Sequence, residues 1–172
     1  MRLVEGVVTV GGEDFPDVEA FVERLEGVAR EASTGAKSPT VQAFDARYVV
    51  SRRHLERAVE LADRARDRGE AIARDRGVEI LLYAAGRRQI NRAMEMGVEE
   101  GETPAVVLVD GGEESAAARA VADLLEPAET LGAYDAARVR SFFDVGQAEL
   151  DATDGGLEGL VLERVALLVV ER

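Results

Sequence analysis

The 172-residue sequence contains no cysteine, and this absence removes three classes of site at once. Disulfide bonds, thiolate catalysis and zinc sites built on cysteine are all excluded. Histidine is almost absent as well, since His54 is the only one. A zinc ion would therefore need carboxylate ligands alone, which is unusual for zinc. The sequence predicts no metal site.

The sequence also lacks any apolar run approaching about 18 residues, the length expected of a membrane-spanning helix. Its N-terminus enters a strand-like segment without a signal-peptide pattern. Hydrophobic residues make up 47% of the chain, an ordinary value for a folded domain. We therefore expect a single soluble domain over residues 1–172, located in the cytoplasm and without a membrane partner.

Lysine occurs once, at Lys37, whereas arginine occurs twenty times. The 34 acidic residues give the chain a formal net charge of -13. An acidic surface with little lysine is typical of halophilic proteins, because concentrated salt screens the repulsion among like charges. We interpret the overall acidity as an adaptation to the solvent rather than as a preference for a partner.

One segment departs from this acidity. Residues 47–92 contain twelve arginines and seven carboxylates, which give this segment a charge of about +5. Charge that is segregated in this way creates a local field that selects partners. Arginine's forked guanidinium suits a phosphate-bearing ligand. The alternative is a helical face covered by solvated ion pairs between residues four apart.

The hydrophobic pattern predicts strands alternating with helices. Strands are expected at 3–10, 40–50, 105–110 and 164–170. Helices are expected at 16–28, 51–68, 70–85, 87–96, 111–127, 134–143 and 147–162, with Ser51 as the cap of the second one. Within 87–96 we expect Ile90, Ala93 and Met94 to face inward. The predicted fold class is α/β, a single domain with a mixed four-stranded sheet flanked by helices.

No catalytic arrangement or phosphate loop is apparent. Ser51 lies three residues before His54, but the spacing identifies no third group, and a helix cap explains Ser51 more simply. The segment TGAKSPT (34–40) lacks the Gly-Lys step of a P-loop, and GGLEG (155–159) is not G-x-G-x-x-G. Carboxylate pairs arise by chance among so many acidic residues and identify no general acid. We expect no catalytic residue and no cofactor.

The basic segment therefore remains the only candidate for a functional surface. Gln89 and Asn91 can read base edges, and Phe44, Tyr48 and Tyr83 offer aromatic faces for stacking. For Phe44 and Tyr83 the alternative is a place in the core, because both lie in apolar patterns.

Three stretches of the sequence together resemble a known family. They are QAFDARYVVSRRHLERAVELA (42–62), VEILLYAAGRRQINRAMEMGV (78–98) and AVVLV (105–109). The most distinctive features are a buried helix, a glycine elbow and a second helix from Glu79 to Ala93. An extended Asp45–Arg47 segment followed by a helix with His54-Leu55 is the second feature. These stretches are similar to the small kinase-binding subunit of the KEOPS complex, the TPRKB family, in its archaeal form.

The resemblance implies a protein that is not an enzyme. KEOPS installs threonylcarbamoyl on the adenosine beside the anticodon of tRNAs that read ANN codons, and a separate transferase subunit does the chemistry. The subunit that this chain resembles docks on the kinase-like ATPase subunit of KEOPS. In archaea it also recruits tRNA by the single-stranded 3′ CCA end.

On this basis the predicted RNA contacts lie at two helix starts. Arginines would hold phosphates, while Gln89 or Asn91 would read a base edge. The predicted set is Arg52, Arg53, His54, Arg87, Arg88, Gln89, Asn91 and Arg92.

Two alternatives remain open from the sequence. The chain could be a protein-interaction adaptor without RNA affinity, whose arginine face docks on an acidic partner. For the surface that docks on the kinase-like subunit, Phe142-Phe143 and the segment 157–162 are candidates, although core packing explains them equally well. The other alternative is a small-molecule enzyme, for which the sequence supplies no catalytic candidate.

Overall fold

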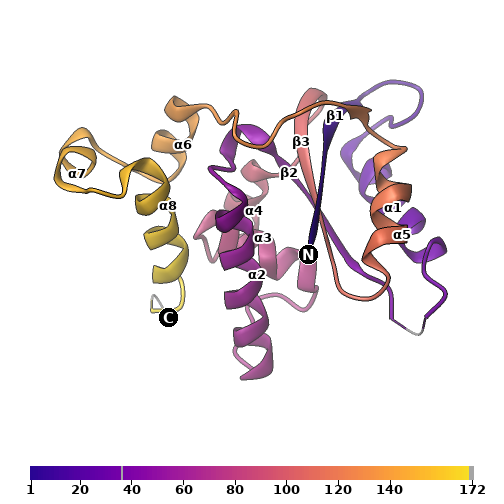
Figure 1. The fold of residues 1–172 in the computed structure, drawn as a ribbon, viewed down its shortest axis with the longest axis horizontal. Helices are drawn as coiled ribbons and strands as arrows, with labels where there is room; N and C mark the ends of the chain where they lie inside the picture. Colours follow the sequence, from indigo (N-terminus) through magenta and orange to yellow (C-terminus); the bar gives the residue numbers. More distant parts are fainter. Residues whose placement is uncertain (36, 171–172) are drawn as a thin grey trace. The chain divides into compact units, whose positions relative to one another are not determined.

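The computed structural model describes residues 1–35 and 37–170, which form two compact units (Figure 1). The first unit consists of Met1–Ala46 and Gly97–Thr130. The second consists of Arg47–Met96 and the described residues from Leu131 onward. Each unit is thus assembled from two separate stretches of the chain.

The first unit contains a four-stranded sheet in the order β2-β3-β1-β4. Its strands are β1 (Arg2–Val10), β2 (Thr40–Asp45), β3 (Gly101–Asp110) and the short β4 (Glu126–Pro127). Every strand pair is antiparallel, with Arg2 opposite Val109 and Asp45 opposite Ala105. The α/β class and the single four-stranded sheet confirm the prediction, but the sheet is antiparallel where a mixed one was expected.

Two helices of the first unit, α1 (Val18–Glu31) and α5 (Glu114–Ala122), lie side by side (Figure 1). Asp17 caps α1 by accepting a hydrogen bond from the Ala20 N–H at 2.7 Å. The helices and one face of the sheet share a hydrophobic core, because apolar residues recur at helical spacing in α1 and at every second position in β1. This core includes Val8, Val10, Phe21, Leu25, Val107, Val109 and Val121.

The second unit is helical. After the 3₁₀ turn η1 (Ala46–Tyr48) it contains α2 (Arg52–Asp67), α3 (Arg76–Ala85), α4 (Ile90–Ala93), η2 (Met94–Met96), α6 (Ala136–Phe142), α7 (Gln147–Ala152) and α8 (Gly156–Leu167). Its buried side chains come from several of these helices and include Leu55, Ala58, Leu61, Ile80, Leu82, Val161 and Val165.

Several predicted elements differ from the observed ones. The strand expected at 40–50 ends at Asp45, where η1 follows, and the helix expected at 87–96 consists of the short α4 and η2. Residues 164–170, expected to be a strand, continue α8 to Leu167 and then form a turn. The helix expected at 70–85 begins only at Arg76, because Asp75 caps it through the Val78 N–H at 2.9 Å. The fourth strand is instead β4, which the sequence analysis assigned to the end of a helix. No helix in the described part of the chain has the length and apolar character needed to cross a membrane.

Candidate nucleic-acid interface

The first group of predicted contacts lies at the start of α2, where Ser51 is the N-cap, as expected. The Ser51 hydroxyl accepts a hydrogen bond from the His54 N–H at 3.3 Å and donates one to Glu158 at 2.8 Å. The cap therefore fixes the start of α2 and also connects it to α8.

His54 is completely buried directly behind this cap. The Val50 N–H donates to Nδ1 at 3.3 Å, so the ring proton is on Nε2, which lies 2.7 Å from the Ala84 carbonyl oxygen and donates to it. Burial lowers the pKa of His54 to about 4, although the Ala84 hydrogen bond and the Glu158 charge act in the opposite direction. The prediction that His54 contacts RNA is wrong, because a neutral buried ring offers nothing to a ligand.

The exposed face of α2 carries arginines that are paired with carboxylates one turn away. Arg52 lies 2.9 Å from Glu56, while Arg57 and Arg64 lie 2.9 Å and 2.8 Å from Glu60. The hydrogen bond from Arg57 is the main reason that the pKa of Glu60 is lowered. Exposed pairs of this kind contribute little stability. Along this face the structure therefore confirms the alternative interpretation, a helix covered by solvated ion pairs.

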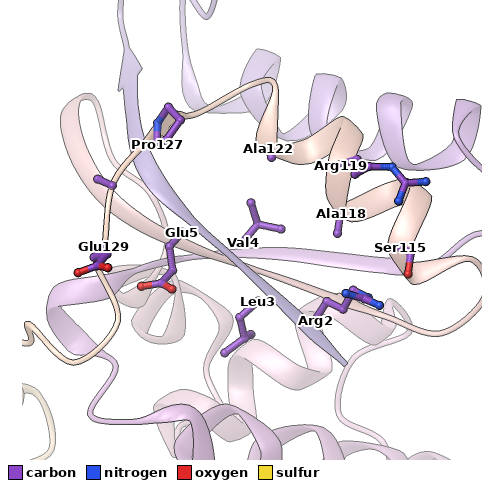
Figure 2. A pocket seen from close by; sticks show the side chains of 11 residues that line it. Arg2, Leu3, Val4, Glu5, Ser115, Ala118, Arg119, Ala122, Pro127 and Glu129 are labelled. Carbon is purple, nitrogen blue, oxygen red and sulfur yellow. The ribbon is translucent and has the colours of Figure 1, made fainter.

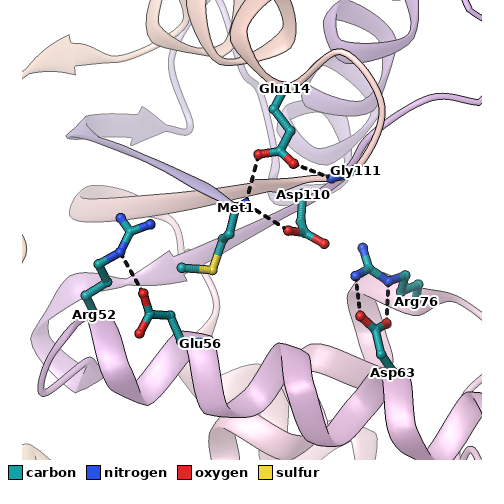
Figure 3. Close-up of polar contacts among 8 residues, drawn as sticks. All are labelled: Met1, Arg52, Glu56, Asp63, Arg76, Asp110, Gly111 and Glu114. Carbon is teal, nitrogen blue, oxygen red and sulfur yellow. Dashed lines mark hydrogen bonds and ion pairs between the residues drawn. The ribbon is translucent and has the colours of Figure 1, made fainter.

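Other arginines of the basic segment hold the loop between α2 and α3. Arg76 donates two hydrogen bonds to Asp63, both at 2.7 Å (Figure 3), and Arg66 donates to the Arg74 carbonyl at 2.8 Å. In the first unit, which contributes nothing to the charge at 47–92, the Met1 amino group lies 3.1 Å from Asp110 and 2.8 Å from Glu114 (Figure 3). The arginine contacts of the second unit are the relevant ones here. Much of the positive charge at 47–92 is thus used within the fold.

Arg53 has no side-chain hydrogen bond or ion pair among the described residues, and it is exposed. It lines a small hollow of about 320 Å³ with Glu56, Arg57, Glu60 and Leu162. Two cations and two carboxylates in this hollow largely cancel each other. Arg53 is therefore available to a partner, but its surroundings do not select an anion.

The second group of predicted contacts lies in the elbow, which we define as residues 86–94. Gly86 ends α3 in the left-handed conformation, with φ of 60°. The N–H of Arg87 bonds to the Leu82 carbonyl at 3.1 Å, which closes the last turn of α3. A Cβ at Gly86 would lie 3.2 Å from the Arg164 carbonyl oxygen, so glycine suits both the left-handed conformation and the close approach.

Arg87 fastens the elbow to α6. Its guanidinium donates a hydrogen bond to the Phe142 carbonyl and lies over the Phe142 ring, 5.2 Å from the ring centroid. Because this side chain is half-buried and already held, its structural role is established, while an RNA contact by Arg87 stays a prediction.

Arg88, Gln89, Asn91 and Arg92 are all exposed on the elbow. In the described part of the chain, the side chains of Arg88, Gln89 and Asn91 make no hydrogen bond or ion pair. Arg92 has only a long contact with Glu95, at 3.8 Å. Two guanidinium groups and two amides are thus brought together on one short segment with their donors available to a ligand.

Ile90 and Met94 are also exposed, with 47% and 56% of their surfaces accessible. The prediction that they face inward is wrong, whereas the same prediction for Ala93 is confirmed, since Ala93 is fully buried. A helix of four residues is too short for hydrophobic periodicity to settle which side faces the core. Sequence reasoning therefore missed an apolar component of the elbow.

The aromatic residues proposed for stacking are unavailable or partly covered. Phe44 and Tyr83 are 0% and 2% exposed, which confirms the alternative that they belong to the core. Tyr48 is half-buried with its ring edge against Phe142, at a centroid distance of 5.4 Å. Phe142 and Phe143 are buried as well and contact each other. Planar groups for stacking on the elbow are therefore the guanidinium groups of Arg88 and Arg92.

The elbow presents cations, amides and apolar side chains to the solvent. Within residues 1–35 and 37–170, no three His, Asp or Glu side chains converge on a position that could hold a metal ion. The arrangement suits recognition of phosphate and of hydrogen-bonding groups.

Comparison with known proteins gives one informative result. The profile of the family described as kinase binding protein CGI-121 matches residues 20–168. This range includes α2, α3 and the elbow. A comparison with curated proteins gave no match. Because the match covers most of the chain, the chain belongs to the kinase binding protein CGI-121 family.

Proposed function

We propose that this chain is a non-catalytic KEOPS subunit that binds the kinase-like ATPase subunit and recruits tRNA through its 3′ CCA end. In this role it would support threonylcarbamoyladenosine formation that another subunit catalyses. Membership of a kinase-binding family supports the first part of the proposal. The exposed side chains of the elbow support the second part.

The observation that carries the RNA proposal is the contrast between the elbow and α2. On α2, Arg52, Arg57 and Arg64 are neutralised by neighbouring carboxylates. On the elbow, Arg88 has no partner among the described residues and Arg92 has a weak one. Unpaired guanidinium groups in a chain of net charge -13 favour an anionic ligand over a neutral one.

The neighbouring amides make a single-stranded nucleic acid the best match. Unpaired nucleotides present base edges and faces together with phosphates, and proteins read them by stacking and by directed hydrogen bonds. Arg88 and Arg92 would contact phosphates or stack on bases, while Gln89 or Asn91 would bond to a base edge. The stacking and base-edge contacts depend less on counterion release than the phosphate contacts do and therefore survive better in concentrated salt.

The test is fluorescence anisotropy of labelled tRNA titrated with the full chain in a high-KCl buffer. Intact tRNA should bind, and tRNA lacking the 3′ CCA should bind at least about tenfold more weakly, a loss of about 1.4 kcal/mol. Equal, weak and salt-sensitive binding of both tRNAs would show only generic attraction and would contradict recruitment by the CCA end.

Charge-reversal variants locate the contact. Arg88→Glu should weaken tRNA binding by about tenfold or more and leave the melting temperature nearly unchanged, because the side chain is exposed. Arg24→Glu, the same change at an exposed position on α1, is the matched control and should bind tRNA normally. Equal effects of the two variants would point to net charge instead of the elbow.

A protein-docking adaptor without RNA affinity is the second candidate, and Ile90 and Met94 favour it. Exposed apolar side chains flanked by arginines are typical of protein interfaces. Under this alternative, Ile90→Asp should abolish binding to the kinase-like subunit, and no tRNA binding should be measurable with any variant. Loss of tRNA binding in Arg88→Glu with the kinase complex intact would reject it.

A further inference from the structure

The first unit leaves part of one sheet edge without a neighbouring strand. β1 pairs with β3 from Arg2 to Val10, but with β4 only at Gly6 and Val7. After β4 the chain leaves the edge of β1. The Thr130 N–H donates a hydrogen bond to the Glu5 carboxylate at 2.9 Å. An uncovered strand edge presents backbone donors and acceptors that can accept another strand.

Two prolines establish which backbone groups face this edge. Pro127 lies opposite Gly6 and Pro104 lies opposite Val7, and neither proline has an N–H to exchange. The N–H and C=O of Gly6 must therefore face β3, and those of Val7 must face β4. Because this direction alternates along an antiparallel strand, the N–H and C=O of Leu3 face the open edge. The described residues place no strand opposite Leu3 on that side.

A hollow of about 760 Å³ lies along this edge, between β1 and α5 (Figure 2). Its middle is apolar, with Val4, Ala118 and Ala122 (Figure 2). Arg2 on β1 and Arg119 on α5 lie on one side of the hollow, and the carboxylates of Glu5 and Glu129 lie on the other. Both arginines are exposed, and neither is in an ion pair in the described part of the chain. Apolar side chains and the two exposed guanidinium groups of Arg2 and Arg119 therefore lie beside the open edge.

We propose that this edge binds an extended peptide as an additional antiparallel strand, with the pattern apolar–x–acidic. The incoming strand would continue the direction in which β4 already runs along β1. Arg2 and Val4 lie two residues apart and therefore on the same face of β1, and Val4 packs against the core that α5 covers. A peptide side chain opposite Val4 would be apolar, and the one two residues later would place a carboxylate beside Arg2 and Arg119.

Backbone hydrogen bonds would supply the affinity and the two side chains the specificity, as in other strand-addition complexes. The peptide residue between the apolar and acidic positions would lie opposite Leu3 and exchange hydrogen bonds with it. This site lies entirely in the first unit and does not depend on the function proposed for the elbow.

The experiment is fluorescence anisotropy of the full chain with a labelled Gly-Thr-Val-Thr-Glu-Gly peptide. Two control peptides carry either Lys in place of Glu or an N-methyl group on the residue between Val and Glu. We expect each control to bind about tenfold more weakly, because one reverses the charge and the other removes the backbone donor. No binding of the first peptide at millimolar concentration, or equal binding of all three, would overturn the proposal.

A charge exchange then tests the location. Arg119→Glu should lose about tenfold in affinity for the Glu peptide and gain affinity for the Lys peptide, whereas Arg24→Glu should bind both as the unchanged chain does. Amide hydrogen exchange at Leu3, measured by NMR, should slow when the Glu peptide is bound. Binding that is indifferent to Arg119→Glu, or an unprotected Leu3 amide in the complex, would show that the peptide does not add to β1.

Discussion

Two polar side chains in the second unit, His54 and Glu79, are completely buried, and each is matched to backbone groups instead of to another charge. His54 donates to the Ala84 carbonyl and accepts from the Val50 N–H. Glu79 accepts from the N–H groups of Ile72 and Ala73, at distances from 2.7 to 3.1 Å. An unsatisfied buried polar group is costly, so the loss of these hydrogen bonds should lower the stability of the second unit.

Replacing Glu79 by Gln should lower the free energy of unfolding by about 1–3 kcal/mol. The carboxylate accepts through both oxygens, whereas the amide has one oxygen and would turn its NH₂ toward a backbone N–H. Urea unfolding measures the loss. The control is Glu56→Gln, which changes only the exposed pair with Arg52 and should cost less than about 0.5 kcal/mol. Similar losses in the two variants would contradict the role assigned to Glu79.

His54 should make stability depend on pH. Its pKa falls from 6.5 to about 4 on folding, so between these values the unfolded chain binds a proton that the folded chain does not. The free energy of unfolding therefore has its full value, as far as His54 is concerned, above pH 6.5. It falls by roughly 3 kcal/mol as the pH is lowered from 6.5 to 4. Urea unfolding from pH 7 to pH 5 should show more than half of the decline, at pH values above the ordinary pKa values of Asp and Glu. In His54→Gln this part of the slope should disappear, and an unchanged slope would assign it to other groups.

The burial of His54 could be predicted from the sequence, while the contact of the Arg87 side chain could not. His54 is spaced from Ala58, Leu61 and Ala65 at helical intervals, and all four are buried. A helical stripe counted from His54 places the ring on the buried side of α2. No spacing rule, in contrast, shows that Arg87 reaches the Phe142 carbonyl, because that contact joins residues 55 positions apart.

At the scale of elements, the predictions succeeded where the hydrophobic pattern was long. They failed where a short segment was considered without its neighbouring residues. The apolar runs of β1 and β3 are both strands, as expected. Residues 164–170 look like a buried strand by themselves, since a short apolar run does not distinguish strand from helix. Extended back to Leu160, the buried positions Leu160, Val161, Val165 and Leu168 follow a helical period. β4, with two residues, leaves no signal in the sequence at all.

The elbow should depend on Gly86 for more than its φ angle. Gly86→Ala forces a side chain into the left-handed region and also brings a Cβ to 3.2 Å from the Arg164 carbonyl oxygen of α8. Gly69 has a similar φ of 71° but no neighbour within 4 Å of the added Cβ, so Gly69→Ala reports the conformational cost alone. We expect a loss of about 1 kcal/mol for Gly69→Ala and about 2–3 kcal/mol for Gly86→Ala in urea unfolding. Equal losses of unfolding free energy in the two variants would mean that α8 shifts enough to accommodate the added Cβ.

At the scale of the whole molecule, the two units are interleaved along the chain. The chain passes from one unit to the other three times, after Ala46, Met96 and Thr130. The two stretches of the second unit are therefore joined through residues 97–130 of the first. If the first unit unfolded alone, this connection would become a flexible loop, and closing the second unit across it would cost additional entropy. Interleaving thus favours unfolding in one step, and the expectation of a single domain stays a prediction that calorimetry can test.

Matched core substitutions test this cooperativity. Leu25 in α1 and Leu61 in α2 are 2% and 3% exposed, and each Leu→Ala change should cost about 2–5 kcal/mol. If the chain unfolds as one domain, both variants should lower the same calorimetric transition by about 2–4 °C per kcal/mol, with equal calorimetric and van't Hoff enthalpies. The unchanged chain should show one peak. Two peaks, of which Leu25→Ala moves one and Leu61→Ala the other, would instead establish two independently folding units, because each substitution then reports only on the core that it disturbs.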